Sequence, residues 1–130
     1  ANVSCYSGGT EATALFPKVA ETLATQGFQL MPLSYESNPV CAIKYDANEA
    51  AIICFSKTYD HPFNPVSYFA AIMTCNSADE ACPIVNGAEA RFPIKYDDPK
   101  AYDGTEQQTA KYAERSLEIA REMWWVFSQI

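Results

Sequence analysis

The stretch Phe69-Ala70-Ala71-Ile72-Met73-Thr74 contains no charged residue, and its first five residues are all apolar. A strand without alternating polar positions is typical of the interior of a parallel sheet that is covered on both faces. Segments with the properties of short strands and of helices alternate on both sides of this stretch. This alternation predicts an α/β protein.

The clearest helix is predicted near the end of the chain, over residues 106–127. Apolar residues recur there every three or four positions, as in a helix with one buried side. They form two stripes: Ala110, Ala113, Leu117, Ala120, Trp124 and Phe127, and then Ile119, Met123, Val126 and Ile130. The other side carries charges of both signs, on Lys111, Glu114, Arg115, Glu118 and Glu122. We therefore predict a helix that packs on a sheet rather than a membrane or partner helix.

A strand and a helix are predicted in the first part of the chain. The strand spans residues 2–6 and ends at Gly8-Gly9. The helix has its apolar stripe over residues 16–26, and Thr10 is its expected N-cap. Pro17 suits the first turn of a helix, and Gly27 suits the position that follows the last turn.

The remaining elements are short. Turn-rich segments separate three strand-like segments, which predicts a meander or hairpin before the apolar stretch. A short helix and one further strand are expected after it. The three strands are predicted at 28–33, 40–45 and 51–56, the short helix at 77–81 and the last strand at 91–96.

The length and charge of the chain exclude several classes of protein. Its 130 residues suit one domain, residues 1–130. The net charge of −7 argues against nucleic acid and membrane partners, because both are bound through clustered lysine and arginine. No apolar run approaches the roughly 18–20 residues that span a bilayer, and no basic and apolar leader opens the chain. Since five cysteines cannot all pair with one another, we expect reduced thiols and a cytoplasmic protein.

The cysteines fall into two kinds. Cys41 and Cys54 lie in strand-like segments and are predicted to be core thiols. Cys75 and Cys82 are seven residues apart, which is two turns of a helix, so they can form a disulfide only if the helix unwinds. One interpretation is two thiols that never meet. The other is a redox pair, in which Cys75 at the start of the short helix is the reactive thiolate.

An acidic motif, Asp97-Asp98-Pro99, follows the last predicted strand. Pro99 favours an extended backbone at Asp98, which would project the side chain of Asp98 from the loop toward a site. The alternative is an ordinary turn with two solvated acids. His61 lies among loop prolines without a cysteine or acid placed to activate it, so we do not expect it to bind a metal or act as a base.

These segments together resemble the thioredoxin-coupled arsenate reductases of the low-molecular-weight protein tyrosine phosphatase superfamily. The resemblance covers about residues 2–28 and 66–130, and the segment at about 29–65 is then a hairpin-like insertion. The family implies a three-layer α/β/α sandwich with a mostly parallel central sheet. The motifs that carry the resemblance are Cys75-Asn76-Ser77-Ala78-Asp79-Glu80-Ala81-Cys82-Pro83, Phe92-Pro93-Ile94-Lys95-Tyr96-Asp97-Asp98-Pro99, and Tyr6-Ser7-Gly8-Gly9-Thr10-Glu11-Ala12 with Phe16-Pro17.

The resemblance also implies roles for individual residues. Asp98 would be the general acid for the leaving oxygen of a small oxyanion ester or a phosphotyrosine, and Asp97 would support it. Cys75 and Cys82 would relay electrons to a disulfide that thioredoxin reduces. Ser7 would help to hold the anion loop, in some members through a bound monovalent cation. No other cofactor is implied.

The sequence departs from the family at its nucleophile, which lies in a Cys-x5-Arg loop. The residue six positions after each cysteine is Glu11, Ala47, Asp60, Ala81 or Ala88, and none of these is arginine. We therefore expect that the first strand and helix of the family precede Ala1, and that this chain is inactive alone. The alternatives are a non-catalytic interaction domain of the same fold, which could repair its sheet as a homodimer, and a Cys75–Cys82 thiol redox switch.

Overall fold

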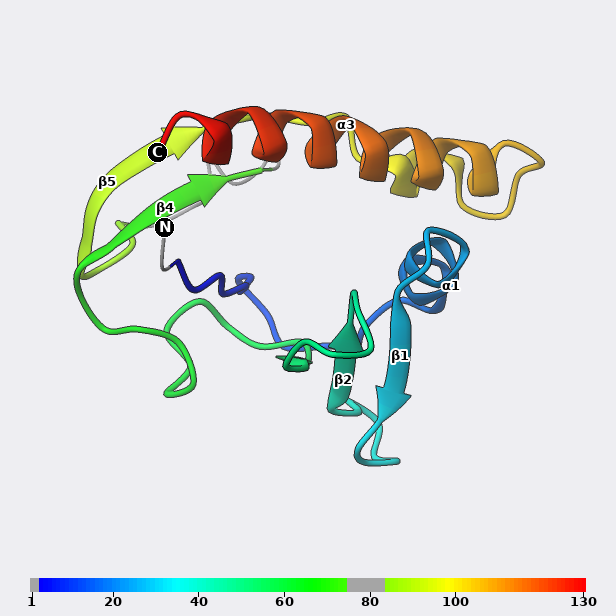
Figure 1. The fold of residues 1–130 in the computed structure, drawn as a ribbon, viewed down its shortest axis with the longest axis horizontal. Helices are drawn as coiled ribbons and strands as arrows, with labels where there is room; N and C mark the ends of the chain where they lie inside the picture. Colours follow the sequence, from blue (N-terminus) through cyan, green and yellow to red (C-terminus); the bar gives the residue numbers. More distant parts are fainter. Residues whose placement is uncertain (1–2, 75–83) are drawn as a thin grey trace.

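The computed structural model describes residues 3–74 and 84–130 of the chain. It is an α/β protein, as predicted (Figure 1). The short helix predicted at 77–81, with Cys75 and Cys82, lies outside the described residues. The described elements are α1 (Pro17–Thr25), β1 (Gln29–Pro32), β2 (Cys41–Lys44), β3 (Ile52–Cys54), β4 (Phe69–Met73), β5 (Ala88–Pro93), the 3-10 helix η1 (Pro99–Tyr102) and α3 (Gln108–Ser128).

Strands β1, β2 and β3 form the predicted meander, an antiparallel sheet in which β2 is central. The register places Leu30 opposite Ile43 and Ala42 opposite Ile53. Ala42 and Ile43 in the central strand are buried, whereas the two outer strands are largely exposed. Helix α1 contacts β1 at one edge of this sheet (Figure 1).

Strands β4 and β5 form a separate, parallel pair, with Ile72 opposite Phe92. The predicted strand at 69–74 is therefore confirmed. Its expected burial on both faces is not, because Ala71 and Met73 are buried while Ile72 is 44% exposed. The described residues thus form two small sheets, and the three-layer sandwich around one central sheet stays a prediction.

The first residues differ from the prediction. The strand expected at 2–6 is wrong over the described residues 3–6, which have no regular structure. A strand needs a neighbour that accepts its hydrogen bonds, and in this part of the described chain the only bridge is an isolated one between Gly9 and Thr58. The N-cap expected at Thr10 is also wrong, because α1 begins at Pro17 after Phe16. Gly27 does follow α1, with a φ of 95°.

Helix α3 is confirmed, and its packed side matches the second predicted stripe in part but not the first. Its first half contacts α1 and η1, and its second half lies against the segment that follows β5. Tyr112 is buried, whereas Leu117 and Trp124 of the first predicted stripe are 54% and 74% exposed. Of the second stripe, Ile119 and Met123 are half-buried. Helical periodicity therefore located the helix and offered two stripes, of which only part of the second lies on the side that packs.

Candidate active site

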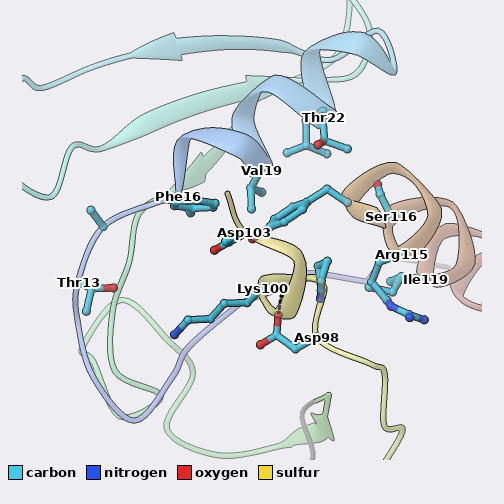
Figure 2. Close-up of a pocket in the computed structure, with 14 residues that line it drawn as sticks. Thr13, Phe16, Val19, Thr22, Asp98, Lys100, Asp103, Arg115, Ser116 and Ile119 are labelled. Carbon is cyan, nitrogen blue, oxygen red and sulfur yellow. Dashed lines mark hydrogen bonds between the residues drawn. The ribbon is translucent and has the colours of Figure 1, made fainter. Parts of the chain in front are cut away.

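A cavity of about 610 Å³ lies between α1, η1 and α3 (Figure 2). The chain before α1 forms one wall, and the turn that carries Asp98 forms another. Most of the apolar lining comes from α1 and the chain before it, where Thr13 and Thr22 add two hydroxyl groups, whereas the charged side chains come from the turn, η1 and α3. The lining residues are Thr13, Ala14, Phe16, Val19, Thr22, Leu23, Asp98, Pro99, Lys100, Asp103, Tyr112, Arg115, Ser116 and Ile119.

Asp98 projects from the turn that follows β5. Its backbone is extended, with φ −69° and ψ 118°, as the following Pro99 predicts. Its carboxylate accepts a hydrogen bond of 2.9 Å from the backbone N–H of Lys100, which caps η1 (Figure 2). The side chains of Asp97 and Asp98 are both exposed. The position suits a group that meets a substrate, and it equally fits the alternative of a capped turn with solvated acids.

Arg115 on α3 holds this acidic turn in place. Its Nε donates a 2.7 Å hydrogen bond to the backbone carbonyl of Asp97, and its Nη2 lies 3.9 Å from the Asp97 carboxylate. A second ion pair to Glu118 fixes the guanidinium on the helix surface. The sequence placed Arg115 on the charged side of the helix, yet its side chain is only 16% exposed. No local signal distinguishes it from its charged neighbours, so sequence reasoning missed it.

Tyr112 is buried and lines the cavity. Its ring packs against Phe16 with 5.9 Å between centroids, and its hydroxyl donates a 2.9 Å hydrogen bond to the Asp103 carboxylate. Burial, this hydrogen bond and the charges of Asp103 and Asp98 raise the pKa of Tyr112 to about 12. Tyr96 is held in the same way: burial and a 2.6 Å hydrogen bond to Glu122 on α3 raise its pKa to about 12.

These two tyrosines predict a loss of stability at alkaline pH. Both have a pKa of about 12 in the folded protein against 10.0 ordinarily. Their contribution, on the order of 2 kcal/mol each, is therefore complete below pH 10 and is lost as the pH rises toward 12. Urea unfolding across this window should show the free energy of unfolding falling in the native chain. The Tyr96→Phe/Tyr112→Phe variant should lose less over the same window.

Tyr35 supplies the matched control, because its side chain is 90% exposed. Tyr35→Phe should leave the alkaline decline as it is in the native chain. A decline equally steep in the Tyr96→Phe/Tyr112→Phe variant would show that other groups cause it.

Ser7 lies in a different polar cluster, and it is not among the described residues that line the cavity. Its backbone carbonyl accepts a 3.1 Å hydrogen bond from the Asn64 side-chain amide, and its hydroxyl accepts one of 3.4 Å from Lys57. Lys57 is only 4% exposed, and its ammonium lies 4.6 Å from the centre of the Phe55 ring. Ser7 is therefore held by the loop that follows β3. Lys57 and Asn64 were missed, since neither belongs to a motif.

The relation of the predicted relay cysteines to Asp98 stays a prediction, since Cys75 and Cys82 lie outside the described residues. The two chain segments that lead to Cys75 and Asp98 do run side by side. The backbone N–H of Tyr96 donates a 3.1 Å hydrogen bond to the carbonyl of Thr74. Both segments thus leave the carboxyl end of the parallel β4–β5 pair.

The contacts of the His61 side chain are with the loop that contains it and with Phe55. Its Nδ1 accepts a 3.1 Å hydrogen bond from the backbone N–H of Phe63, and its ring packs edge-on against Phe55. Over residues 3–74 and 84–130, no three histidine, cysteine or acidic side chains are grouped to hold a metal ion. Neither α1 nor α3 combines the length and hydropathy that a membrane-spanning helix requires.

Comparisons with models of protein families, with curated proteins and with solved structures find no match for this chain.

Proposed function

We propose that this chain belongs to an enzyme of oxyanion chemistry, similar to the low-molecular-weight protein tyrosine phosphatases and the thioredoxin-coupled arsenate reductases. The observation that carries the proposal is the placement of Asp98. It follows the carboxyl end of a parallel strand pair, which is where active sites of α/β proteins gather. Arg115 on α3 holds the turn through the Asp97 carbonyl, and the Asp98 carboxylate caps the N-terminus of η1. The carboxylate therefore has a defined position beside a cavity.

Asp98 would act as the general acid. A cysteine thiolate would attack the phosphorus or arsenic, and the Asp98 carboxyl would give its proton to the leaving oxygen, so that no phenolate or hydroxide is expelled. Asp97 would support Asp98 through its contacts with Arg115. The nucleophilic thiolate would come from outside residues 1–130, as would the strand that completes the central sheet of a three-layer sandwich.

The paired cysteines favour a reductase within this proposal. Reduction of arsenate to arsenite takes two electrons, which thiols supply by becoming a disulfide. Cys75 would attack the arsenylated nucleophile and release arsenite, and Cys82 would then attack the disulfide so formed. The Cys75–Cys82 disulfide would be reduced by the dithiol of thioredoxin. The substrate class is a small oxyanion or a phosphotyrosine, and a cytoplasmic location fits the reduced thiols that this chemistry requires.

The proposal predicts that residues 1–130 alone have no turnover. They should neither hydrolyse para-nitrophenyl phosphate nor reduce arsenate in the presence of thioredoxin, thioredoxin reductase and NADPH. The reason is that no cysteine in the chain has an arginine six positions later to bind the anion. The measurements are p-nitrophenol release and NADPH consumption, with an active phosphatase and an active reductase as positive controls. Turnover in either assay would show that the nucleophile lies within residues 1–130.

A second candidate function, a non-catalytic interaction domain, is favoured by the exposed surface. The chain exposes 9341 Å², about a third more than the roughly 6,800 Å² typical of a folded monomer of 14.4 kDa. Large apolar side chains are exposed on both sheets and at the end of α3, which favours association, for example as a homodimer. The coding sequence upstream of Ala1 separates the two candidates. An in-frame Cys-x5-Arg supports the enzyme, and a start codon directly before Ala1 supports the interaction domain.

A further inference from the structure

Cys41 and Cys54 face each other across two neighbouring strands. They are register partners in the antiparallel pair β2–β3, and both are half-buried free thiols. Directly opposed residues of antiparallel strands lie on the same face of the sheet, with Cα atoms about 4.5 or 5.5 Å apart. A disulfide needs a Cα separation of roughly 4.4–6.8 Å. The pair therefore meets the backbone requirement for a disulfide without any change of register.

The register of this pair is fixed from both sides. On one side the ladder continues with Ala42 opposite Ile53. On the other side the Asn38 side chain brackets Ser56: its amide donates a 2.8 Å hydrogen bond to the Ser56 carbonyl, and its oxygen accepts one of 3.3 Å from the Ser56 N–H. A slip of one residue would send the two thiols to opposite faces of the sheet. The bracket thus keeps them together.

Burial has a larger effect than the neighbouring charges on how readily Cys54 reacts. Burial raises the pKa of the Cys54 thiol, and the neighbouring Cys41 raises it further, while the Lys57 ammonium lowers it. Burial is the largest of the three effects, so the pKa of Cys54 lies above its ordinary value. A thiol of this kind is inert as an isolated nucleophile near neutral pH, and it exchanges more readily when the pH is raised.

We propose that Cys41 and Cys54 are a thiol-oxidation site. They form a cross-strand disulfide with each other by exchange with a low-molecular-weight disulfide such as oxidised glutathione. The thiolate of one cysteine attacks glutathione disulfide, which gives a mixed disulfide and releases one glutathione thiolate. The thiolate of the other cysteine attacks the protein sulfur of the mixed disulfide, which releases the second glutathione. Two protein thiols are thus oxidised, one glutathione disulfide is reduced, and both thiol protons end on glutathione. The proposal does not depend on the proposed function.

A hydrogen bond between Ser56 and Thr13 connects the cysteine pair to the cavity. Ser56, two residues after Cys54, accepts a 2.9 Å hydrogen bond on its hydroxyl from the backbone N–H of Thr13. Thr13 in turn lines the cavity beside α1. A disulfide would tie β2 to β3 next to this contact. The Cys75–Cys82 relay of the proposed function is chemically separate, and a peptide map distinguishes the two disulfides.

The test is oxidation of the folded chain. Residues 1–130 are incubated at pH 8 with oxidised glutathione, the remaining thiols are alkylated, and the peptides are mapped by mass spectrometry with and without reduction. We expect a cross-link that joins Cys41 to Cys54, formed about ten times faster than in 8 M urea, because the fold holds the two thiols at a high effective concentration. Absence of a Cys41–Cys54 cross-link in the folded chain, or its formation at the same rate in 8 M urea, would overturn the proposal.

Three variants make the result specific. Cys41→Ser and Cys54→Ser should each lose the cross-link, and the remaining cysteine should accumulate the glutathione adduct instead. Cys5→Ser should leave the cross-link unchanged, because Cys5 lies outside both strands. Formation of equally abundant disulfides between Cys5 and either strand cysteine would contradict a site defined by strand register. Circular dichroism of each variant confirms that the chain is folded before oxidation.

Discussion

Asp98→Asn is expected to lower kcat by about 10²- to 10⁴-fold in the enzyme proposed above, with little change in KM, because general acid catalysis typically contributes this much. Asparagine keeps the size of the side chain and its hydrogen bond to the Lys100 N–H, but it has no proton to give to a leaving oxygen. The measurement is steady-state hydrolysis of aryl phosphates across a range of pH. The alkaline limb of the native kcat profile, which reports loss of the acid's proton, should disappear in the variant.

The leaving group separates a general acid from a structural residue. p-Nitrophenolate leaves without much help, whereas phenolate needs a proton, so Asp98→Asn should slow phenyl phosphate much more than para-nitrophenyl phosphate. The matched control is Asp97→Asn, whose main contact, the backbone carbonyl bound by Arg115, is kept. It should lower kcat only a few-fold. An equal loss of activity on both substrates would mean that Asp98 only caps η1.

Gly87→Ala is expected to destabilise the fold by about 3–4 kcal/mol, the largest effect on stability that we predict for a single methyl group. Gly87 directly precedes β5 and has a φ of 85°, a backbone conformation that residues with a Cβ rarely adopt. A Cβ at this position would lie 1.9 Å from the carbonyl oxygen of Val66, which is backbone and cannot rotate away. The loop before β4 and the start of β5 would have to separate.

Gly104 provides a control, because it has a similar backbone conformation but open space around an added Cβ. Its φ is 75°, and an added Cβ would meet nothing within 4 Å. Gly104→Ala should therefore cost only about 1 kcal/mol, the penalty for a left-handed alanine. Urea unfolding followed by circular dichroism gives both free energies. Equal losses in the two variants would show that the close approach of Gly87 to Val66 does not contribute.

Most helices and strands could be predicted because their signals are local. Pro17 and Gly27 bracket α1, turn-rich segments separate the strands of the meander, and the apolar run beginning at Phe69 marks β4. The strand expected at residues 2–6 failed for a non-local reason. Its apolar residues suit a strand, but in the described chain no neighbouring strand lies beside residues 3–6 to complete the hydrogen bonds. Strand formation depends on a partner that local sequence does not specify.

The candidate site could be predicted only in part. Asp98 was identified from the proline that follows it, and its extended backbone is as expected. Arg115 could not be found, because it is one of several charged residues on α3 and only the packing of α3 against η1 turns it toward Asp97. Lys57 was missed for the same reason, since its burial against Phe55 and Ser7 is a property of two loops that are distant in sequence.

By itself the sequence determined that Phe69-Ala70-Ala71-Ile72-Met73 is a strand, that the chain is an α/β protein and that a long helix ends it. These features follow from periodicity and turn residues, which act over a few neighbouring positions. Only the tertiary structure decided which side of α3 is buried, that Arg115 holds the Asp98 turn, and that Cys41 lies opposite Cys54. Such contacts arise when distant segments pack, and the free energy of that packing is shared among residues that no local pattern connects.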